Sequence, residues 1–507
     1  MLNKRTKDLH LTLLTAAFLV LCFPGFNLWF LAWFGFVPLF FAVKDKSKLK
    51  AFLLSYLAGV IFWFGLIYWL IHVTFMGLVV LVLYLALYFG IFGLVVSNFQ
   101  PPTSNFQLLF IPSLWVILEY LRSHLFTGFG WALLGYSQYL NLPAIQIADI
   151  TGAYGVSFLV MMANVMIYSA ISHKQVAISQ RQKYILPVLY ILITLTYGYY
   201  KIYHLPLSAH HSPLTISVIQ GNIPQELKWN ISAKDFIINK YLGLSREAVS
   251  DAPDLIIWPE AALPEALEKG SPSYESMSNF SRKIDTPLLL GAVISEDNLY
   301  YNSALLFSNE GRLLIRYDKL HLVPFGEYIP LRKALGFLET VVPIGDFTPG
   351  GEHTVFTLPT TYYLLPTKFS ILICFEDIFP ELSRQFVKRG AEFLVNITND
   401  AWFGKTASPY QHLQSSVFRA VENRRFLIRA ANTGVSGFID PRGEIISEVS
   451  DEAAERIFIS GYKTQKILSS SRLSFYTRYG DIFVLLVSFL ALYGIIQPIK
   501  ISKKQRL

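Results

Sequence analysis

The sequence predicts a polytopic α-helical membrane domain of about eight spans joined to an α/β domain. Its 507 residues are 53% hydrophobic and only 15% charged, and the mean hydropathy is +0.42. A soluble domain of ordinary composition is much less apolar. The hydrophobic residues gather in runs on both sides of one long polar block, in which strand-like and helical segments alternate. The chain therefore combines a lipid-embedded part with a separate globular part.

Eight hydrophobic runs are candidate membrane spans. They cover residues 10–24, 25–43, 51–72, 75–97, 106–121, 153–171, 184–201 and 480–497. The third and fourth are long enough to cross about 30 Å of hydrocarbon as single helices. The first run follows Lys4, Arg5 and Lys7 and could be a signal peptide, but no small-residue cleavage site follows it. We therefore expect seven spans in residues 1–204, and one span with a basic tail in residues 476–507.

The basic residues lie beside the hydrophobic runs, which argues against nucleic acid as the reason for the formal charge of +8. Four clusters stand out: Lys4, Arg5 and Lys7; Lys44, Lys46, Lys48 and Lys50; Lys174, Arg181 and Lys183; and Lys500, Lys503, Lys504 and Arg506. With eight spans all four fall on one face, and an excess of Lys and Arg marks the cytoplasmic face. Both termini are then predicted in the cytoplasm, and the polar block on the outer side.

The polar block, residues 205–475, has the pattern of a layered α/β domain. Its strand-like runs are "LTISVIQ", "DLIIWPE", "PLLLGAVIS", "RLLIRYDK" and "FLVNITND", and residues 235–249 and 409–431 have a helical pattern. Its sequence has no glycine-rich phosphate loop and no His/Cys cluster with metal-ligand spacing. We therefore expect no cofactor and no metal.

The membrane part does not have the pattern of a transporter. Its hydrophobic runs carry almost no ionisable side chains, and Glu119, Arg122 and Asp149 lie near predicted helix ends. We expect it to anchor the outer domain in the bilayer.

Cys374 is one of only two cysteines, and it follows the apolar run "KFSILI". Packing in a buried strand is one explanation, because free cysteine is among the most buried residue types. The other cysteine, Cys22, lies in the first hydrophobic run, out of reach under the predicted topology. An unpaired thiol outside the cytoplasm is either sealed in the core or kept for its reactivity. A reactive thiol needs a base and a cationic or dipolar partner.

Two further motifs offer such groups. "DLIIWPEAALP" places Glu260 just after a strand, and "RYDKLHLVPFGEYIP" places Lys319 at a strand end and Glu327 in the loop that follows. Each residue alone is explained as a solvated charge. Together with "ICFED" at Cys374, the motifs resemble the nitrilase superfamily. That resemblance implies an α-β-β-α sandwich and a Glu-Lys-Cys triad, in which Cys374 is the nucleophile, Glu260 the general base and Lys319 the cation beside the oxyanion.

The placement of this domain between seven spans and one span resembles the apolipoprotein N-acyltransferase family, over essentially the whole chain. "QGNIPQELKW", "VNITNDAWFG" and "QHLQSSVFRAVENRRFLIRAANTGVSG" are similar to family segments that line or support the active site. By position, Trp229, Glu327 and Glu376 match further family residues. The family usually has tyrosine after the cysteine, where this chain has Phe375, so a hydroxyl is missing while an aromatic wall remains; core packing is the alternative.

The resemblance implies transfer of a fatty acyl chain from a phospholipid to the α-amino group of an apolipoprotein's N-terminal diacylglyceryl-cysteine, through a Cys374 thioester. The phospholipid donor, the diacylglyceryl apolipoprotein acceptor and the membrane are then the partners of a monomer that binds no nucleic acid. It implies a bacterial inner-membrane enzyme with its catalytic domain in the periplasm. A membrane-tethered amidase with the same triad and a non-enzymatic binding protein are the alternatives.

Two further hypotheses concern other segments of the polar block. Residues 335–351, which include Phe337 and Phe347, are a candidate lid that would keep water from the thioester, or only a packed connection. His412 and Asp400 could form a papain-like arrangement with Cys374, although a structural histidine at a helix start is the favoured interpretation.

Overall fold

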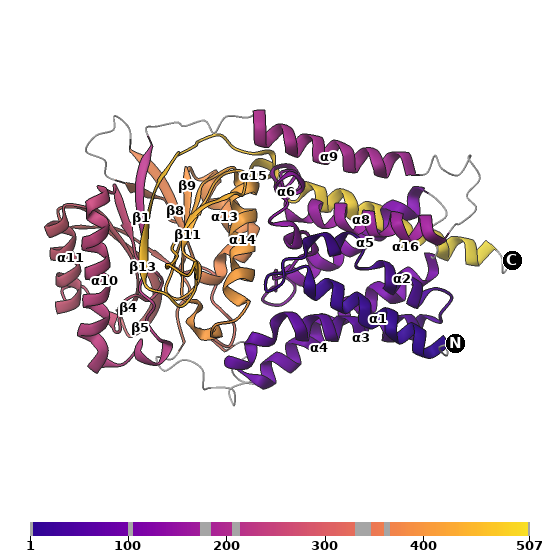
Figure 1. Cartoon of the computed structure of the whole chain (residues 1–507), viewed down its shortest axis with the longest axis horizontal. Coiled ribbons are helices and arrows are strands. Elements are labelled where there is room, and N and C mark those ends of the chain that lie inside the picture. Colours follow the sequence, from indigo (N-terminus) through magenta and orange to yellow (C-terminus); the bar gives the residue numbers. More distant parts are fainter. Residues whose placement is uncertain are drawn as a thin grey trace. The chain divides into compact units, whose positions relative to one another are not determined.

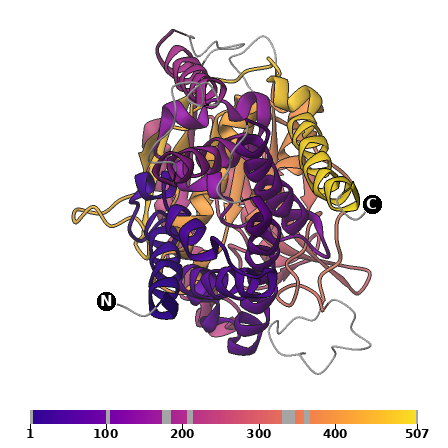
Figure 2. The same ribbon diagram turned by 90° about the vertical axis from the view of Figure 1, so that its right-hand side faces the viewer.

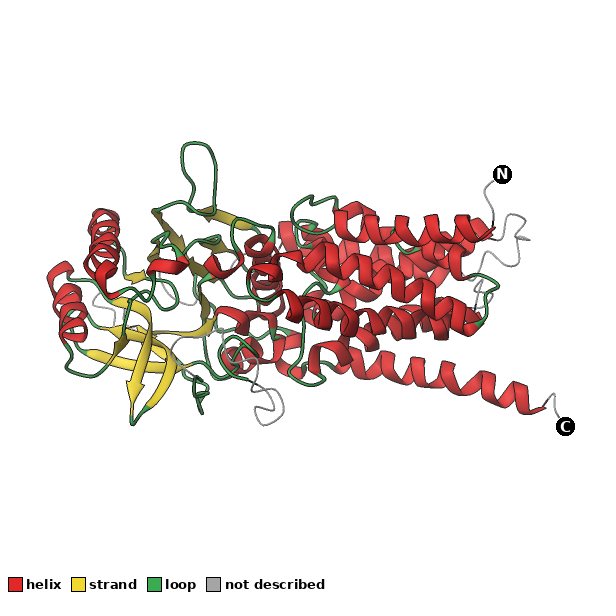
Figure 3. Ribbon diagram, turned by 90° about the horizontal axis from the view of Figure 1, so that it is seen from below, coloured by secondary structure: helices red, strands yellow, loops and turns green. Residues whose placement is uncertain are grey.

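The computed structural model describes residues 4–99, 105–172, 184–204, 213–329, 346–358 and 366–504. The chain divides into two compact units, which Figure 1 traces from the N-terminus to the C-terminus. Residues 1–205 and 479–507 form one, called here the helical unit, and residues 206–478 form the other, the mixed-sheet unit. In the described part of the chain, all strands belong to the mixed-sheet unit (Figure 3).

Helical structure lies at each of the eight predicted hydrophobic runs. The segments are α1 (Lys4–Leu21), η1 (Trp29–Trp33) with α2 (Val37–Val43), α3 (Lys48–Ile67) with η2 (Tyr68–His72), α4 (Phe75–Val96), α5 (Asn105–His124), α8 (Ala153–Ser172), α9 (Ile185–His204) and α16 (Ile482–Lys504). Two short helices, α6 (Leu142–Ile145) and α7 (Ala148–Thr151), precede α8, and α15 (Phe475–Tyr479) precedes α16.

Four helical segments are both long and apolar enough to cross a bilayer: Lys48–His72, Phe75–Val96, Ala153–Ser172 and Ile185–His204. Trp29–Val43 and Ile482–Gly494 are apolar but shorter. Helix α1 begins with charged residues, and α5 carries Glu119 and Arg122. A membrane domain is therefore well supported, and the number of eight spans stays a prediction.

The long helices of the helical unit pack against one another side by side (Figure 2). Helix α3 packs against α4 and α1, and α5 packs against α8 and α16. Close approach of α3 and α4 depends on Gly59, where an added Cβ would lie only 2.8 Å from the Cβ of Phe89. Small residues at such contacts let helix backbones approach each other closely. In lipid, van der Waals packing drives helix association, because the hydrophobic effect does not act between helices there.

The ionisable side chains of the helical unit make internal contacts. The Arg122 guanidinium donates to the carbonyl oxygens of Phe129 and Trp131, both at 2.7 Å, and Glu119 accepts from the Leu134 N–H at 2.6 Å. Asp149 pairs with Lys201 at 3.0 Å. These charges hold the chain after α5 and near α9, which agrees with an anchor better than with an ion pathway.

Two mixed sheets form the centre of the mixed-sheet unit. The seven-stranded sheet has the order β13 (Gly461–Ile467), β1 (Leu214–Gln220), β2 (Leu255–Ile257), β4 (Leu288–Glu296), β5 (Leu299–Phe307) and β6 (Leu313–Asp318), with β3 (Ala266–Leu267) also paired to β4. The six-stranded sheet has the order β12 (Ile445–Glu448), β11 (Gly437–Ile439), β10 (Leu427–Ala431), β9 (Phe393–Thr398), β8 (Thr367–Ile373) and β7 (Phe356–Leu358). Parallel pairs lie at the centres, β1–β2–β4 and β8–β9–β10, and antiparallel strands flank them.

The sheets face each other, and helices cover their outer faces. Helices α10 (Lys234–Ala248) and α11 (Pro272–Ile284) pack on the seven-stranded sheet, and α13 (Pro380–Lys388) and α14 (Ser408–Asn423) on the six-stranded one (Figure 1). Strands β1 and β5 contact β10 and β8 across the interface. The predicted layered α/β domain is confirmed, and the structure shows that both of its sheets are mixed.

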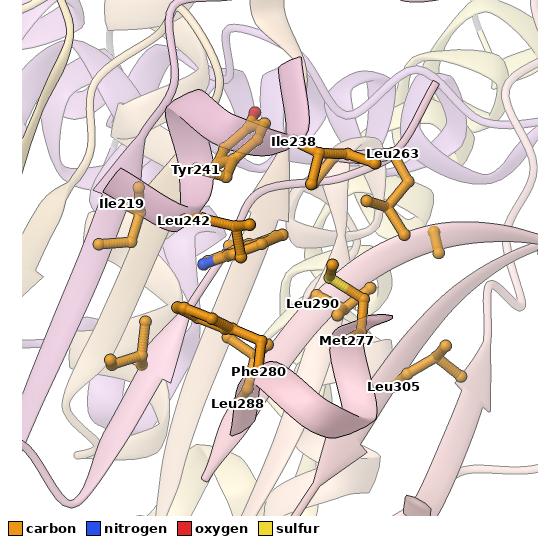
Figure 4. Close-up of a cluster of buried hydrophobic side chains, with 14 of the residues drawn as sticks. Ile219, Ile238, Tyr241, Leu242, Leu263, Met277, Phe280, Leu288, Leu290 and Leu305 are labelled. Carbon is orange, nitrogen blue, oxygen red and sulfur yellow. The ribbon is translucent and has the colours of Figure 1, made fainter. Parts of the chain in front are cut away.

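A buried apolar cluster joins α10 and α11 to their sheet (Figure 4). Met277 and Phe280 of α11 lie beside Leu290 and Leu288 of β4, and Tyr241 of α10 belongs to the same cluster. These helices turn one apolar face inward, as the helical pattern of the sequence requires. Burying a side chain of this size contributes about 1.5–3 kcal/mol, so the cluster fixes the helices on the sheet.

The prediction of one helix over residues 409–431 is wrong at its C-terminal end. Helix α14 ends at Asn423, and Arg424 takes a left-handed backbone with φ of 53°. Residues Leu427–Ala431 then form β10, paired with β9 and β11. The segment "FLIRAA" is apolar enough for either structure, and sheet pairing rather than helical periodicity decides its conformation.

A buried ion network ties α14 to the six-stranded sheet. The His412 ring contacts Asp377 at 2.9 Å and Asp400 at 3.0 Å, and Arg429 pairs with Asp377 at 3.0 Å. Burial would lower the pKa of His412, but the carboxylates of Asp377 and Asp400 outweigh it and raise the pKa to about 9. His412 therefore stays protonated at neutral pH, where an unfolded histidine is largely neutral.

We expect this network to make stability depend on pH in the neutral to alkaline range. Because the folded pKa of about 9 exceeds the unfolded value of 6.5, the contribution is complete below pH 6.5 and is lost as pH rises through about 9. The thermal unfolding midpoint of the full-length protein in detergent should fall over this range, and the fall should be smaller in His412→Gln. His353→Gln, a partly exposed histidine of the same unit, should keep the wild-type slope. An unchanged slope in His412→Gln would contradict the assignment.

Candidate active site

Strand ends from both sheets bring three of the predicted side chains together. Glu260 follows β2, Lys319 follows β6 directly, and Cys374 follows β8 directly. Carboxyl ends of parallel strands are the usual position of sites in α/β sheets. The Lys319 Nζ lies 3.5 Å from the Glu260 Oε1, and both Glu260 and Lys319 act electrostatically on the Cys374 thiol.

A buried ammonium between two carboxylates forms the centre of the site. Lys319, 1% exposed, contacts Glu327 at 2.8 Å and lies near Glu260, and both glutamates are buried. Burial would lower the pKa of Lys319, but Glu327 and Glu260 outweigh it and raise the pKa above its usual value. Lys319 is therefore a permanent cation.

Asn302 of β5 links the two carboxylates. Its Nδ2 donates to the Glu260 Oε1 at 2.7 Å and to the Glu327 Oε1 at 2.8 Å. An amide nitrogen carries two N–H groups, so one neutral side chain can satisfy both acids and hold them at a fixed separation.

Glu260 is held from both sheets. The main-chain N–H of Asn399, just after β9, donates to the Glu260 Oε2 at 2.9 Å, and the Lys228 ammonium donates to the Glu260 carbonyl oxygen at 2.9 Å. Gly291 of β4 passes so close that an added Cβ would lie 2.6 Å from the Glu260 Cα. The carboxylate therefore has one position, which a base that takes a proton from a fixed donor requires.

Cys374 stands at a sharp turn between β8 and the 3-10 turn η10 (Cys374–Ile378). Its φ of 52° is in the left-handed region, where a residue other than glycine is strained, and such strain is typical of functional positions. The side chain is partly exposed, and the carbonyl oxygen accepts from the Asn396 Nδ2 at 3.1 Å. Burial and the Glu260 carboxylate raise the pKa of the thiol well above its ordinary value, although Lys319 opposes them. The resting residue is a thiol, and its reaction as a nucleophile needs a base.

Glu376 connects the turn of Cys374 with the chain after Lys319. Its Oε1 accepts from the Tyr317 hydroxyl at 2.8 Å and from the main-chain N–H groups of Leu320 at 2.7 Å and His321 at 3.1 Å. Its Oε2 accepts from the Ile373 N–H at 2.7 Å. The side chain is fully buried and accepts from four donors, so it supports the site without facing a substrate.

Aromatic side chains lie beside these groups. Phe375 is partly exposed, with its ring centroid 5.4 Å from that of Phe379 and 6.3 Å from that of His321. Trp229, also partly exposed, packs against the cluster of Val293, Leu322 and Phe347. The role predicted for Phe375, an aromatic wall for an acyl chain, stays a prediction.

The lid hypothesis falls mostly outside the described residues. Of the segment 335–351, residues 335–345 are not described, and Phe337 is among them. Phe347 is buried, and its N–H donates to the Glu327 carbonyl oxygen at 2.8 Å. Phe347 therefore packs beside the site.

The His412 ring contacts the main chain of Cys374. Its Nε2 lies 3.2 Å from the Cys374 carbonyl oxygen, and the same ring contacts two carboxylates. This agrees with the structural role favoured for His412 at the start of α14.

Four supporting residues escape the sequence analysis. Asn302, Asn396 and Asn399 are single amides, and Lys228 is one lysine among many. Asn396 and Asn399 lie inside "VNITNDAWFG", and Lys228 lies inside "QGNIPQELKW". The sequence therefore predicts that these segments lie at the active site, but it does not single out these side chains. For Asn302, the one sequence signal of a role in the site is its position in the strand next to the one that Lys319 follows.

We expect Glu376→Gln to destabilise the protein. A glutamine would turn an NH₂ group toward N–H donors that now share a carboxylate, which costs about 1–3 kcal/mol for the unsatisfied groups. Denaturant unfolding of the full-length protein in detergent measures this loss. The exposed Glu381, paired with Arg384 on α13, is the matched control, and Glu381→Gln should stay within about 0.5 kcal/mol of wild type. Wild-type stability in Glu376→Gln would contradict the role given to this carboxylate.

Comparisons with known proteins identify the family of this chain. Residues 15–166 match the model of the apolipoprotein N-acyltransferase N-terminal domain, and residues 215–463 match the model of the carbon-nitrogen hydrolase domain. The apolipoprotein N-acyltransferase of Geobacter metallireducens is 40% identical, over 94% of this chain and 92% of that protein. The one of Haemophilus influenzae is 30% identical, over 95% and 93%. Among solved structures, Saccharomyces cerevisiae Nit3 of the nitrilase superfamily is 19% identical, over 50% of this chain and 90% of that one, with a TM-score of 0.39. The extent and identity of the matches to its relatives show that this chain belongs to the apolipoprotein N-acyltransferase family.

Proposed function

We propose that this protein transfers a fatty acyl chain from a membrane phospholipid to the α-amino group of an apolipoprotein's N-terminal diacylglyceryl-cysteine, through a thioester on Cys374. The observation that carries the proposal is the buried Lys319, which lies between Glu327 and Glu260 and acts electrostatically on the partly exposed residue Cys374. Family membership over nearly the whole chain supports the choice of substrates.

The first half of the reaction acylates the enzyme. Glu260 takes the proton of Cys374, and the sulfur attacks the ester carbonyl carbon of the phospholipid. Lys319 and the main-chain N–H groups after Cys374 stabilise the tetrahedral oxyanion. When the carbon–oxygen bond breaks, the lysophospholipid oxygen takes the proton from Glu260, and the acyl group stays on sulfur as a thioester.

The second half passes the acyl group to nitrogen. The α-amine of the acceptor attacks the thioester carbonyl carbon, and Glu260 takes a proton from that nitrogen. The carbon–sulfur bond breaks, the amide leaves, and the Cys374 sulfur recovers the proton from Glu260. Donor and acceptor thus react in turn at one site, so we expect ping-pong kinetics.

The substrates explain the tether to the bilayer. Drawing an acyl chain of about sixteen carbons into water would cost on the order of 12 kcal/mol, so the site must receive the lipid from the membrane. We propose that all eight hydrophobic runs span a bacterial inner membrane and that the mixed-sheet unit faces the periplasm. The four clusters of Lys and Arg, which then share the cytoplasmic face, support this orientation. We expect the protein to act as a monomer.

The acyl-enzyme is the species that tests this proposal. Incubation of the full-length protein with phospholipid micelles, without acceptor, should add the mass of one fatty acyl group that hydroxylamine removes. Cys374→Ser should gain no such hydroxylamine-labile group, because serine would form an oxygen ester at best. Addition of a diacylglyceryl-cysteine peptide should discharge the wild-type adduct and yield the acylated peptide.

Two results would contradict the proposal in different ways. If no phospholipid gives an adduct, the donor is wrong, and a tethered amidase of the same superfamily becomes the better interpretation. If the adduct forms but only water removes it, the acceptor is wrong. Acyl transfer by Cys374→Ala at the wild-type rate would exclude the thioester.

A further inference from the structure

The carbonyl group of Cys374 is held by two side chains from different elements. The Nδ2 of Asn396, on β9, donates to this oxygen at 3.1 Å, and the Nε2 of His412, on α14, lies 3.2 Å from it. A carbonyl oxygen can only accept, so the His412 contact requires a proton on Nε2. The reaction scheme gives neither side chain a role, although both contact the main chain of the nucleophile.

Asn396 is an unfavourable residue for its position unless its donors are needed. It is fully buried, and its Oδ1 has no hydrogen-bond partner among the residues that the structure describes. A buried polar atom without a partner destabilises a fold, so such an atom calls for an explanation. The Nδ2 donates to the carbonyl oxygens of Leu372 and Cys374, at 3.1 Å each. These carbonyls lie on either side of Ile373, so the amide fixes the chain where β8 turns into η10.

These contacts lie where the backbone is strained. Cys374 has a φ of 52°, which residues other than glycine seldom adopt. Such a conformation persists only when the surrounding structure holds it. The His412 ring also holds the next part of the turn, because its Nε2 lies 2.9 Å from the Asp377 Oδ1. Asn396 and His412 therefore fix the strained turn from a strand and from a helix.

A fixed carbonyl group also fixes the N–H group of the next residue. In a planar trans peptide unit the C=O and N–H bonds point in opposite directions. Asn396 and His412 lie on the carbonyl side of the peptide unit after Cys374, so the N–H of Phe375 points away from both. Within the described part of the chain, the structure shows no acceptor for this N–H. It is therefore available to a group that binds beside Cys374.

We propose that Asn396 and His412 are positioning residues for oxyanion stabilisation. By holding the Cys374 carbonyl, they aim the N–H of Phe375 at the oxygen of the tetrahedral intermediate. This inference rests on the proposed function, in which Cys374 attacks an ester carbonyl and main-chain N–H groups share the oxyanion with Lys319. Neither residue touches the substrate. A donor that is in place before the reaction stabilises the developing charge without reorganisation.

Two reactions of the same thiol separate this role from a general structural one. Acylation by p-nitrophenyl hexanoate passes through a tetrahedral oxyanion before p-nitrophenolate leaves, whereas iodoacetamide loses iodide to the sulfur and forms no oxyanion. Both rates are measured by intact mass on the full-length protein in detergent, with Cys374→Ala as the blank. A displaced thiol or a less stable fold lowers both rates. The ratio of acylation to alkylation therefore reports on the oxyanion donors.

Asn396→Ala removes the amide that holds the turn. We expect acylation to become about ten- to a hundredfold slower, less than for complete loss of an oxyanion donor, because the N–H remains but is no longer aimed. Alkylation should stay within about twofold of wild type, since it needs no oxyanion. Asn423→Ala is the matched control. Asn423 is also fully buried, and its Nδ2 donates to a main-chain carbonyl oxygen, that of Arg419 at 3.0 Å, so this variant should keep the wild-type ratio.

Two variants at His412 test the second donor with the same loss of charge. His412→Asn places an amide near the position of Nδ1, toward Asp400, and has no group at the position of Nε2. His412→Gln is one methylene longer and carries its amide near the position of Nε2. We expect the ratio of acylation to alkylation to fall in His412→Asn and to remain near wild type in His412→Gln. This pair also decides the question if Asn396→Ala does not fold.

The outcomes separate this inference from the proposed function. Equal losses of acylation and alkylation in Asn396→Ala would assign Asn396 a purely structural role and overturn the inference. Equal ratios in His412→Asn and His412→Gln would overturn the role given to His412. If the ester leaves no acyl group on wild-type Cys374 while iodoacetamide modifies it, the proposed function fails, and the inference that rests on it fails with it.

Discussion

The ammonium of Lys319 sits between two buried carboxylates, and the arrangement of the site depends on this ion cluster. An ammonium without a partner at 1% exposure would be expelled or would lose its proton, and two carboxylates without a cation would repel each other. Lys319 lies 2.8 Å from Glu327 and 3.5 Å from Glu260, so the ammonium is paired and the repulsion between the two carboxylates is offset. These distances hold only while the strands next to these residues keep their positions. The geometry of the ion cluster therefore depends on strand pairing in the mixed-sheet unit.

The same constraint explains the neutral residues around the cluster. Asn302 donates to both carboxylates, and the Asn399 N–H reaches Glu260 from the opposite sheet. Neither adds charge, so each fixes an acid without changing the charge balance between Lys319 and the two carboxylates. The strained backbone of Cys374 then holds a thiol with a raised pKa near Glu260, the proposed base, whose carboxylate has a fixed position. A nucleophile that is protonated until the base acts suits the proposed mechanism, in which the thioester has to outlast the departure of one lipid and the arrival of the next.

Sequence motifs predict the three residues of the proposed triad, but they do not predict most of the residues that hydrogen-bond to them. Glu260, Lys319 and Cys374 end apolar strands, so their patterns place them at the rims of sheets, and the structure brings them together. Asn302 and Lys228 act through contacts with residues 25 to 42 positions away, which no local pattern encodes. The sequence predicts helix at Leu427–Ala431, where the structure has strand β10, because a buried apolar run fits either structure. In the helical unit, hydropathy predicts the helical segments at all eight hydrophobic runs but not the short helices α6 and α7. Helices α1 and α5 carry too much charge for composition to decide whether they cross the bilayer.

The most direct test of the ion cluster is the single-turnover rate of acyl-enzyme formation in the double variant Lys319→Met with Glu327→Gln. This pair of substitutions removes one positive and one negative charge, so the site keeps its net charge, and Glu260 keeps the N–H donors of Asn302 and Asn399. The rate of thioester formation from phospholipid should fall by about two to three orders of magnitude, as for loss of an oxyanion donor, while the unfolding midpoint changes little. Acylation at the wild-type rate would show that Lys319 does not stabilise the developing charge and would contradict the account.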